Sequence, residues 1–439
     1  MTTTSHDRRI ANARRGGTEH PSITAAITSL FAKLFDRDRM LQRAYQIGAI
    51  KRLRAQHPLD VLLALVRCAV GDEHRSVATA RRQFHDLTGF MPEESSFYER
   101  LTPGLADLGW EMFLQVLARS NRVQRKAVAR ALGVHVRDIR VVDGSSVMLP
   151  QRAAAHFPST DSKLGGFKLT TTLSLLEDLV VNVRVTDARQ HDRKAFELPN
   201  DVRSVLWLMD RGYSDHKLFA QIDAGKGTFI IRLKTTSQPV VTAIRSGLAK
   251  AHRGQPLART LPCFGVVDVD ARFTVGRGSR VFRVIGIPVA NTKQGEPGWV
   301  WLATNLPTRV AAATVGAFYR LRWTIETLFK ILKSVGRLDE LRSGNPAVVQ
   351  VFIAATLIGF ALSQALCALM RAARPGCDPS LYRVFALLLT NFGRLVDALA
   401  NGTLPAVIPQ FVKALWREGL NPNPGRPYAR ERHLATVGD

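Results

Sequence analysis

The chain has 439 residues, enough for two or three domains and at least one large hydrophobic core. Its 46% hydrophobic and 22% charged residues are typical of a globular protein and not of a disordered one. Lysine and arginine number 61 against 36 acidic residues, and the resulting net charge of +25 favours a nucleic acid partner. A basic bias of the whole proteome, or binding to a membrane surface, is the alternative source of this charge.

The cysteines predict a reducing compartment. They form no C-x-x-C pair and have no histidine nearby at the spacing of a zinc site, so we expect free thiols at Cys68, Cys263, Cys367 and Cys377. The N-terminal sequence has no apolar core typical of a secretory signal. These features predict a cytoplasmic protein.

The N-terminal third predicts helices. Residues 1–20 are polar and basic and predict a disordered arm, and residues 23–135 carry apolar side chains at helical spacing. The stretch 75–101 predicts a helix, a glycine-containing turn and a second helix that Ser95 could cap. Two interpretations stay open, a helix–turn–helix that binds DNA and a plain helical hairpin with a solvated basic face; its basic residues include Arg81, Arg82 and Arg100. We assign residues 1–135 to a helical N-terminal DNA-binding region.

The middle of the chain changes to the apolar pattern of strands. A helix is expected at about 214–225 and a long one over about 308–335. Strands are expected at 139–149, 168–176, 178–188, 204–213, 228–234, 239–243, 265–273, 280–290 and 298–304. This order predicts a mixed α/β sheet in a domain over 136–340, with a β-rich insertion at about 228–305.

Residues 341–439 predict a helical C-terminal region with a basic, proline-rich tail at 421–433. The apolar run 348–370 is long enough for a membrane span, but the polar residues Gln350, Ser363 and Gln364 interrupt it. We therefore expect a buried core helix there and no membrane partner.

Two aspartates follow strongly apolar strands. Asp143 follows 139–142, and Asp210 follows 205–209. Acidic side chains are rarely buried unless paired or bound to a metal, and carboxylates at the ends of central strands can meet at one edge of a sheet. For either residue alone, an aspartate that simply begins a turn is an equally ordinary explanation.

A third carboxylate, Glu326, lies on the helix expected at 319–335. At about 100° per residue, five polar side chains fall within a stripe of about 80°, and the opposite face is apolar. The stripe consists of Tyr319, Arg322, Glu326, Lys330 and Lys333. The alternative is a solvated charged face in which Glu326 pairs with Lys330.

Three carboxylates can hold two Mg²⁺ ions, which prefer oxygen ligands. Two such ions can activate an attacking oxygen and stabilise a leaving one in phosphoryl transfer. Cations beside the carboxylates would bind the phosphates that flank the scissile bond.

At these residues the chain resembles the DDE transposases of the insertion sequence 4 family. The family pattern Y-x2-R-x3-E-x6-K is met by Tyr319, Arg322, Glu326 and Lys333. Its first two acids lie in D-G-[ST] and D-R-G-[FY] contexts, matched here by Asp143-Gly144-Ser145 and Asp210-Arg211-Gly212-Tyr213. The resemblance runs from about residue 50 to 370.

The resemblance implies an RNase H-like mixed sheet with a β-rich insertion, flanked by helical N- and C-terminal regions. It implies Mg²⁺ or Mn²⁺, two ions held by Asp143, Asp210 and Glu326. It also implies cut-and-paste transposition at terminal inverted repeats into target DNA, by at least a dimer in the synaptic complex. The DNA-binding residues it suggests, together with the charged stripe, are Arg211, Tyr319, Arg322, Lys330 and Lys333. In the family a tryptophan of the insertion stacks on a flipped base, for which Trp299 and Trp301 are candidates beside the alternative of core residues.

Secondary candidates lie after the third strand. Asp187 and Asp192, with His191 beside them, predict either a fourth acidic contact or a polar loop and a helix cap. Lys163 and Lys168 predict either DNA contacts or a solvated edge. Two other functions remain open: a non-catalytic DNA-binding protein derived from a transposase, and an RNase H-like nuclease without strand transfer.

Overall fold

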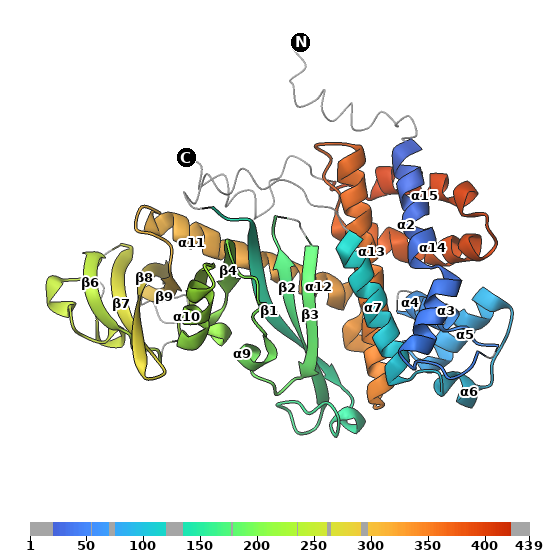
Figure 1. The fold of residues 1–439 in the computed structure, drawn as a ribbon, viewed down its shortest axis with the longest axis horizontal. Coiled ribbons are helices and arrows are strands. Elements are labelled where there is room, and N and C mark those ends of the chain that lie inside the picture. Colours follow the sequence, from blue (N-terminus) through green and yellow to red (C-terminus); the bar gives the residue numbers. More distant parts are fainter. Residues whose placement is uncertain are drawn as a thin grey trace, which may run out of the picture. The chain divides into compact units, whose positions relative to one another are not determined.

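A computed structural model describes residues 21–53, 55–69, 75–119, 135–176, 179–234, 236–260, 265–290 and 297–422 (Figure 1). The chain divides into two compact units. The helical unit comprises Met1–Asn121 and Ile331–Pro424, and the sheet unit comprises Arg122–Lys330 and Gly425–Asp439. The expected N-terminal arm, Cys263 and nearly all of the basic tail lie outside the described residues. None of the other three cysteines forms a disulfide.

The helical unit is built around one long apolar helix, α13 (Pro346–Ala373), which is capped by Asn345 and begins with a proline. It is long and apolar enough to cross a membrane, but 94% of its most apolar window is buried within the protein. A core helix was expected here, and the burial agrees with that. The other helices described in this unit are α2 (Pro21–Leu34), α3 (Arg37–Gln46), α4 (Pro58–Cys68), α5 (Val77–Thr88), α6 (Glu94–Tyr98), α7 (Pro103–Arg119), α14 (Leu381–Ala400) and α15 (Leu404–Glu418).

The predicted helix–turn–helix is present as α5 and α6. Gly89 ends α5 in the left-handed conformation with φ of 69°, which glycine adopts without strain. The expected cap was wrong: Ser95 lies inside α6, and the cap position is Glu93, which makes no side-chain cap bond. Helix α6 has five residues, and Arg81 is turned inward, donating to the carbonyl of Pro92 at 3.0 Å.

The sheet unit contains one mixed sheet of nine strands in the order β3-β2-β1-β4-β5-β9-β8-β7-β6 (Figure 1). The predicted mixed α/β architecture is thereby confirmed. The strands are β1 (Asp138–Leu149), β2 (Gly165–Ser174), β3 (Leu179–Asp187), β4 (Val205–Met209), β5 (Thr228–Arg232), β6 (Val240–Ser246), β7 (Val267–Val275), β8 (Gly278–Ala290) and β9 (Pro297–Thr304).

The strand at 228–232 belongs with the central strands. Strand β5 pairs in parallel with β4, as β4 does with β1. The four later strands are antiparallel to their neighbours and join the same sheet through pairing of β9 with β5. The later strands therefore extend one continuous sheet, and they begin after β5 instead of at residue 228.

Helices cover both faces of this sheet. Helix α10 (His216–Ala224) buries Leu218, Phe219 and Ile222 in a core cluster with Trp207 and Met209 of β4. Helix α11 (Ala312–Arg320) packs against β5 and β8, and Figure 1 draws it behind the strands that α10 lies in front of. Strand β5 therefore contacts both α10 and α11.

The long helix expected at 308–335 is interrupted. Helix α11 passes into a 3-10 turn, η5 (Leu321–Trp323), before α12 (Thr324–Ser334). The hydroxyl of Thr324 donates to the carbonyl of Leu321 at 2.7 Å. This bond takes an acceptor that a regular α-helix would use, which tightens the turn.

A buried ion pair connects the later strands to the chain that leads into α11. Arg283 on β8 binds both carboxylate oxygens of Asp268 on β7, at 2.9 and 2.6 Å. The same guanidinium donates to the carbonyls of Pro307 and Val310, which precede α11. Only 4% of the Arg283 side chain is exposed. Its position therefore depends on these partners.

We predict that Asp268→Ala lowers the free energy of unfolding of the sheet unit by about 3 kcal/mol, since it leaves a buried guanidinium without its carboxylate. Urea unfolding measures this loss. Asp270→Ala is the matched control, because Asp270 pairs with the less buried Arg245, and it should cost less than about 1 kcal/mol. Equal losses for the two variants would contradict the assignment.

Candidate active site

Asp143 and Asp210 occupy matched positions on neighbouring parallel strands. The pairing of β1 with β4 ends at Val142 and Met209, and each aspartate is the next residue. Because side chains alternate along a strand, both carboxylates project to the face of Val141 and Leu208, the face opposite α10. The structure therefore brings the two predicted acids side by side. We expected Asp143 at the end of its apolar strand. Instead, β1 continues past Asp143 to Leu149 as the partner of β2.

The third predicted acid reaches this pair through an arginine. Arg322 donates from Nη1 to Oδ2 of Asp143 and from Nη2 to Oε1 of Glu326, each at 3.0 Å. Tyr319 donates its hydroxyl to Oδ1 of Asp210 at 3.2 Å. Tyr319 thus contacts Asp210 and Arg322 contacts Asp143, in spite of the 3-10 turn between α11 and α12, whereas Glu326 is linked to the pair only through Arg322.

Burial and the neighbouring acids disfavour the charged forms at this site. Burial raises the pKa of Asp143 to about 6, although the backbone N–H of Gly144 and the charge of Arg322 act in the opposite direction. Asp210 and Asp192 also raise the pKa of Asp143 by repulsion. Burial, followed by the charge of Asp210, raises the pKa of Tyr319. The phenol therefore stays protonated and remains a hydrogen-bond donor.

Comparison with known proteins places this geometry in a family. The sequence profile described as "Transposase DDE domain" matches residues 135–360. The chain is 45% identical over 357 residues to "Putative transposase InsL for insertion sequence element IS186A" of Escherichia coli (strain K12), covering 75% of this chain and 91% of that protein. The chain belongs to the DDE transposase family.

More distant relatives agree with this membership. "Transposase for insertion sequence element IS231C" of Bacillus thuringiensis subsp. berliner is 20% identical over 415 residues, 85% of this chain and 84% of that protein. "Putative transposase y4zB" of Sinorhizobium fredii (strain NBRC 101917 / NGR234) is 24% identical over 239 residues, 54% of this chain and 63% of that protein. The expected resemblance to insertion sequence 4 transposases fits these relatives, and the mixed sheet is consistent with an RNase H-like DDE domain.

A fourth acid, Asp192, lies beside the two glycines that follow the aspartates in the motifs, Gly144 and Gly212. A Cβ added to Gly144 would lie 3.0 Å from Oδ1 of Asp192, and one added to Gly212 would lie 2.6 Å from Oδ2. Lys168 binds the same carboxylate from Nζ at 2.7 Å. The glycines of the D-G-S and D-R-G-Y motifs therefore leave the space that this carboxylate fills.

Three of the other secondary candidates make structural contacts, and a role of these residues in binding metal or DNA stays a prediction. The carboxylate of Asp187 accepts from the backbone N–H groups of Arg189 and Gln190, which makes it part of a polar loop. His191 caps α9 (Asp192–Ala195) by accepting from the N–H of Arg193. Lys168 is directed inward onto Asp192 and lies 12% exposed, whereas Lys163 is exposed in a loop.

A buried hydroxyl adjoins the acids on the α10 side. Tyr213 is 1% exposed, and its oxygen has no hydrogen-bond partner among the described residues. Burial raises its pKa, with further contributions from Asp192, Asp143 and Asp210. A neutral phenol therefore lies among three carboxylates.

Sequence reasoning missed one cation of the site. Arg232 lies at the end of β5, where its Nη1 is 3.9 Å from Oδ1 of Asp210. The position of Arg232 in the strand could have identified it. Strand β5 is parallel to β4 and Met209 pairs with Ile231, so Asp210 and Arg232 are the next residues on the two strands. Because the sequence analysis assigned 228–232 to the insertion, it did not align Arg232 with Asp210.

The remaining predicted DNA contacts are spread around the acids. Arg211 and Lys330 are exposed, on the loop after β4 and on α12 respectively. Lys333 lies one turn further along α12, in the part of the helix that belongs to the helical unit. Trp299 and Trp301 stack on each other at 5.7 Å on one face of β9 and pack against the core cluster, while remaining partly exposed. The structure alone leaves their role in DNA binding as a prediction.

Transposases of the DDE family generally use divalent metal ions, and the donor chemistry fits. Asp143, Asp210 and Glu326 offer the hard oxygen ligands that Mg²⁺ and Mn²⁺ prefer. No group of three or more acidic, histidine or cysteine side chains lies close enough to hold an ion within the described ranges. Arg322 balances the charges of Asp143 and Glu326.

We predict that Gly212→Ala destabilises the sheet unit by about 1–3 kcal/mol, because the new methyl group overlaps an Asp192 carboxylate that Lys168 holds in place. Urea unfolding measures the change. Gly278→Ala is the control: its Cβ would meet nothing closer than 3.9 Å. The double variant Gly212→Ala/Asp192→Ala should be more stable than Gly212→Ala alone. If removing Asp192 restores nothing, the packing explanation fails.

Proposed function

We propose that this transposase cuts DNA at the terminal inverted repeats of an insertion sequence element and transfers the freed ends into target DNA. The observation that supports this most is the pair Asp143 and Asp210 at matched strand positions, together with Arg322, which joins Asp143 to Glu326 from a distant part of the chain. Three separate acids on two strands and a helix have no evident role in packing. Their arrangement is suited to phosphoryl transfer.

In this proposal Asp143, Asp210 and Glu326 hold two divalent ions. Bound ions would supply activation of the attacking oxygen and stabilisation of the leaving oxygen. Asp143 and Asp210 already lie side by side, and the Glu326 carboxylate would leave Arg322 to join them. Arg322, released from its carboxylates, is placed to bind a phosphate beside the scissile bond.

Other residues are assigned to the DNA by position. Tyr319 keeps a neutral hydroxyl on Asp210 and orients that carboxylate. Lys330 and Lys333 continue the charged side of α12, and Arg211 follows Asp210 on an exposed turn. Trp299 and Trp301 are candidates to stack on a displaced base, since their rings are partly exposed.

We also propose the wider organisation. Residues 1–135 bind DNA, 136–340 form the catalytic domain, and 341–439 complete the core and support pairing of subunits. Two element ends must be held together during transfer, so the active complex contains at least a dimer. The protein acts in the cytoplasm, on the nucleoid.

We predict that Asp143→Ala, Asp210→Ala and Glu326→Ala each reduce cleavage to background and leave DNA binding within about twofold, because they remove metal ligands and not phosphate contacts. Cleavage of duplexes carrying the element's own ends, with Mg²⁺, and anisotropy of the same duplexes measure the two quantities. Glu197→Ala is the control, because Glu197 is an exposed acid paired only with Arg184 in the described structure.

The same experiment separates the alternatives. Wild-type protein that binds the ends tightly and never cuts them would indicate a non-catalytic DNA-binding protein. Nicks without joined products would indicate an RNase H-like nuclease that lacks strand transfer. Retained cleavage in one of the three variants would remove that acid from the catalytic set.

We predict that Arg322→Ala weakens DNA binding and lowers the slope of log affinity against log salt by about one, as expected for the loss of one phosphate contact. Arg320→Ala, at an exposed arginine two residues away, is the control for a general loss of charge. A salt titration over about 50 to 200 mM measures both slopes. An Arg322→Ala slope equal to that of wild type would show that this residue contacts no phosphate.

A further inference from the structure

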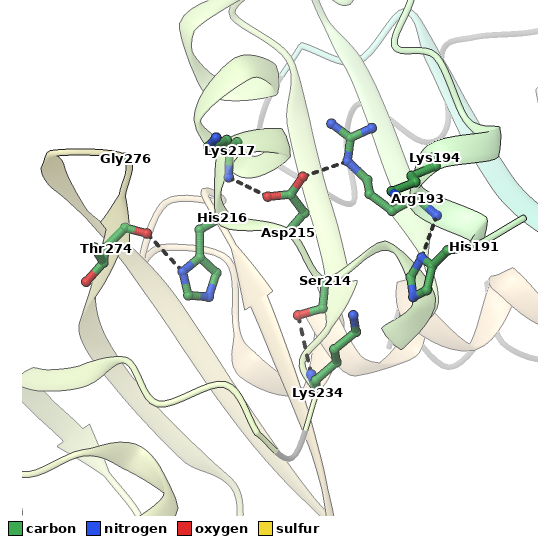
Figure 2. A pocket seen from close by; sticks show the side chains of 10 residues that line it. All are labelled: His191, Arg193, Lys194, Ser214, Asp215, His216, Lys217, Lys234, Thr274 and Gly276. Atoms are coloured by element: carbon green, nitrogen blue, oxygen red, sulfur yellow. Dashed lines mark hydrogen bonds and ion pairs between the residues drawn. The ribbon is translucent and has the colours of Figure 1, made fainter.

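A second cationic site lies in the sheet unit, in a cavity of about 450 Å³ (Figure 2). Its walls come from four segments: α9, the start of α10 with the two residues before it, the end of β5, and the hairpin between β7 and β8. The central strands and the later strands of the sheet therefore build this cavity together. Its volume is within the range of about 300–1,000 Å³ that holds small ligands or parts of larger ones.

The lining excludes an apolar ligand. No hydrophobic side chain contributes to it, and it contains four permanent cations, Arg193, Lys194, Lys217 and Lys234. Asp215 is the only carboxylate in the lining. That carboxylate is already engaged, since it accepts from Nε of Arg193 at 2.8 Å and from the backbone N–H of Lys217 at 2.9 Å. The cavity therefore carries excess positive charge.

Three lysines supply this excess. Within the described ranges, no hydrogen bond or ion pair engages the ammonium groups of Lys194, Lys217 and Lys234. Lys194 and Lys217 are exposed, and Lys234 is half-buried. Like charges gathered around one cavity repel each other, so an anion bound among them would be favoured.

The walls are held in place independently of these lysines. The ring of His216 bonds the carbonyl of Thr274 and the hydroxyl of Ser237, each at 3.0 Å, so neither of its nitrogens is available to a ligand. Ser214 accepts from the backbone N–H of Lys234 at 3.3 Å. Figure 2 shows the His216 ring turned toward Thr274 and Arg193 turned toward Asp215. The cavity is thus preformed.

Three segments that line the cavity follow residues of the candidate active site in the chain. Arg193 and Lys194 follow Asp192, the segment of Ser214 to Lys217 follows Asp210 by one turn, and Lys234 lies two residues after Arg232. An anion in the cavity would therefore lie against segments that also carry Asp192, Asp210 and Arg232. A duplex or single strand presents a phosphate at every nucleotide, which gives such a ligand without a second molecule.

We propose that this cavity binds a backbone phosphate of the DNA strand that flanks the scissile phosphodiester bond, through Lys194, Lys217 and Lys234. The assignment rests on the proposed transposase function for its ligand. The cavity would add one DNA contact to those proposed for Tyr319, Arg322, Lys330 and Lys333.

The experiment combines a double variant with neutral DNA linkages. Lys217→Gln/Lys234→Gln is compared with wild type and with Lys250→Gln, an exposed lysine of the later strands that does not line the cavity. The probes are duplexes with the element's own ends, in which a single methylphosphonate replaces one phosphate at a time around the cleavage position. Affinity is measured by anisotropy across a salt series without divalent ions.

We expect the double variant to lower the salt slope by about 0.9, the value for one phosphate contact on duplex DNA. One methylphosphonate position should weaken wild-type and Lys250→Gln binding severalfold and have no effect on the double variant, because the two changes remove the same contact. Equal effects of every linkage in all three proteins, or an unchanged slope, would overturn the proposal.

The outcomes separate this proposal from the proposed function. Wild-type protein that shows the linkage effect but never cleaves DNA would retain the phosphate site and reject the transposase activity. Wild-type protein that cleaves, with a double variant indistinguishable from it in slope and linkage response, would reject the phosphate site alone. Wild-type protein that does not bind the ends rejects both.

Discussion

The burial of acidic side chains is the constraint on which the candidate active site depends. Asp143 and Asp210 are fixed side by side because β1 and β4 are hydrogen-bonded in parallel up to the preceding residues. Burial raises the pKa of Asp143 to about 6, and repulsion from Asp210 and Asp192 adds a smaller contribution. The fold must therefore bring cations to this edge, and it does so from the neighbouring strand with Arg232 and from η5 with Arg322. The placement of η5 is thus an electrostatic requirement as much as a packing one.

The same reasoning explains why glycines follow both aspartates. Asp192 adds a further negative charge beside Gly144 and Gly212, and Lys168 is its immediate counter-ion. A Cβ at position 212 would lie 2.6 Å from a carboxylate oxygen of Asp192, and one at position 144 would lie 3.0 Å from the other oxygen. A glycine at each position therefore leaves the Asp192 carboxylate where it binds Lys168. Neither Gly144 nor Gly212 has a positive φ, so neither is needed for an unusual backbone conformation. Each glycine instead allows the Asp192 carboxylate to approach the backbone closely.

The sequence pattern predicted the strand and helix positions of the three acids, but it did not predict the 3-10 turn or the position of Arg232. Continuous apolar runs before Asp143 and Asp210 identify strands, and the i, i+3, i+4 spacing identifies the polar side of the catalytic helix. The 3-10 turn escaped prediction because a single hydroxyl, that of Thr324, diverts one carbonyl without altering the apolar pattern. Arg232 escaped because periodicity does not reveal which strand pairs with which. Pairing partners are a long-range property, and the parallel alignment of β5 with β4 is needed to place that arginine beside Asp210.

The later strands act as a structural support for the site as well as an extension of the sheet. Arg283 fixes them to the segment that enters α11, and His216 fixes the β7–β8 hairpin to the segment that follows Asp210. One connection leads to the helix that carries Tyr319, and the other to the strand end that carries Asp210. A displacement of these strands would therefore move both partners of the Tyr319–Asp210 hydrogen bond and would also change the width of the cationic cavity.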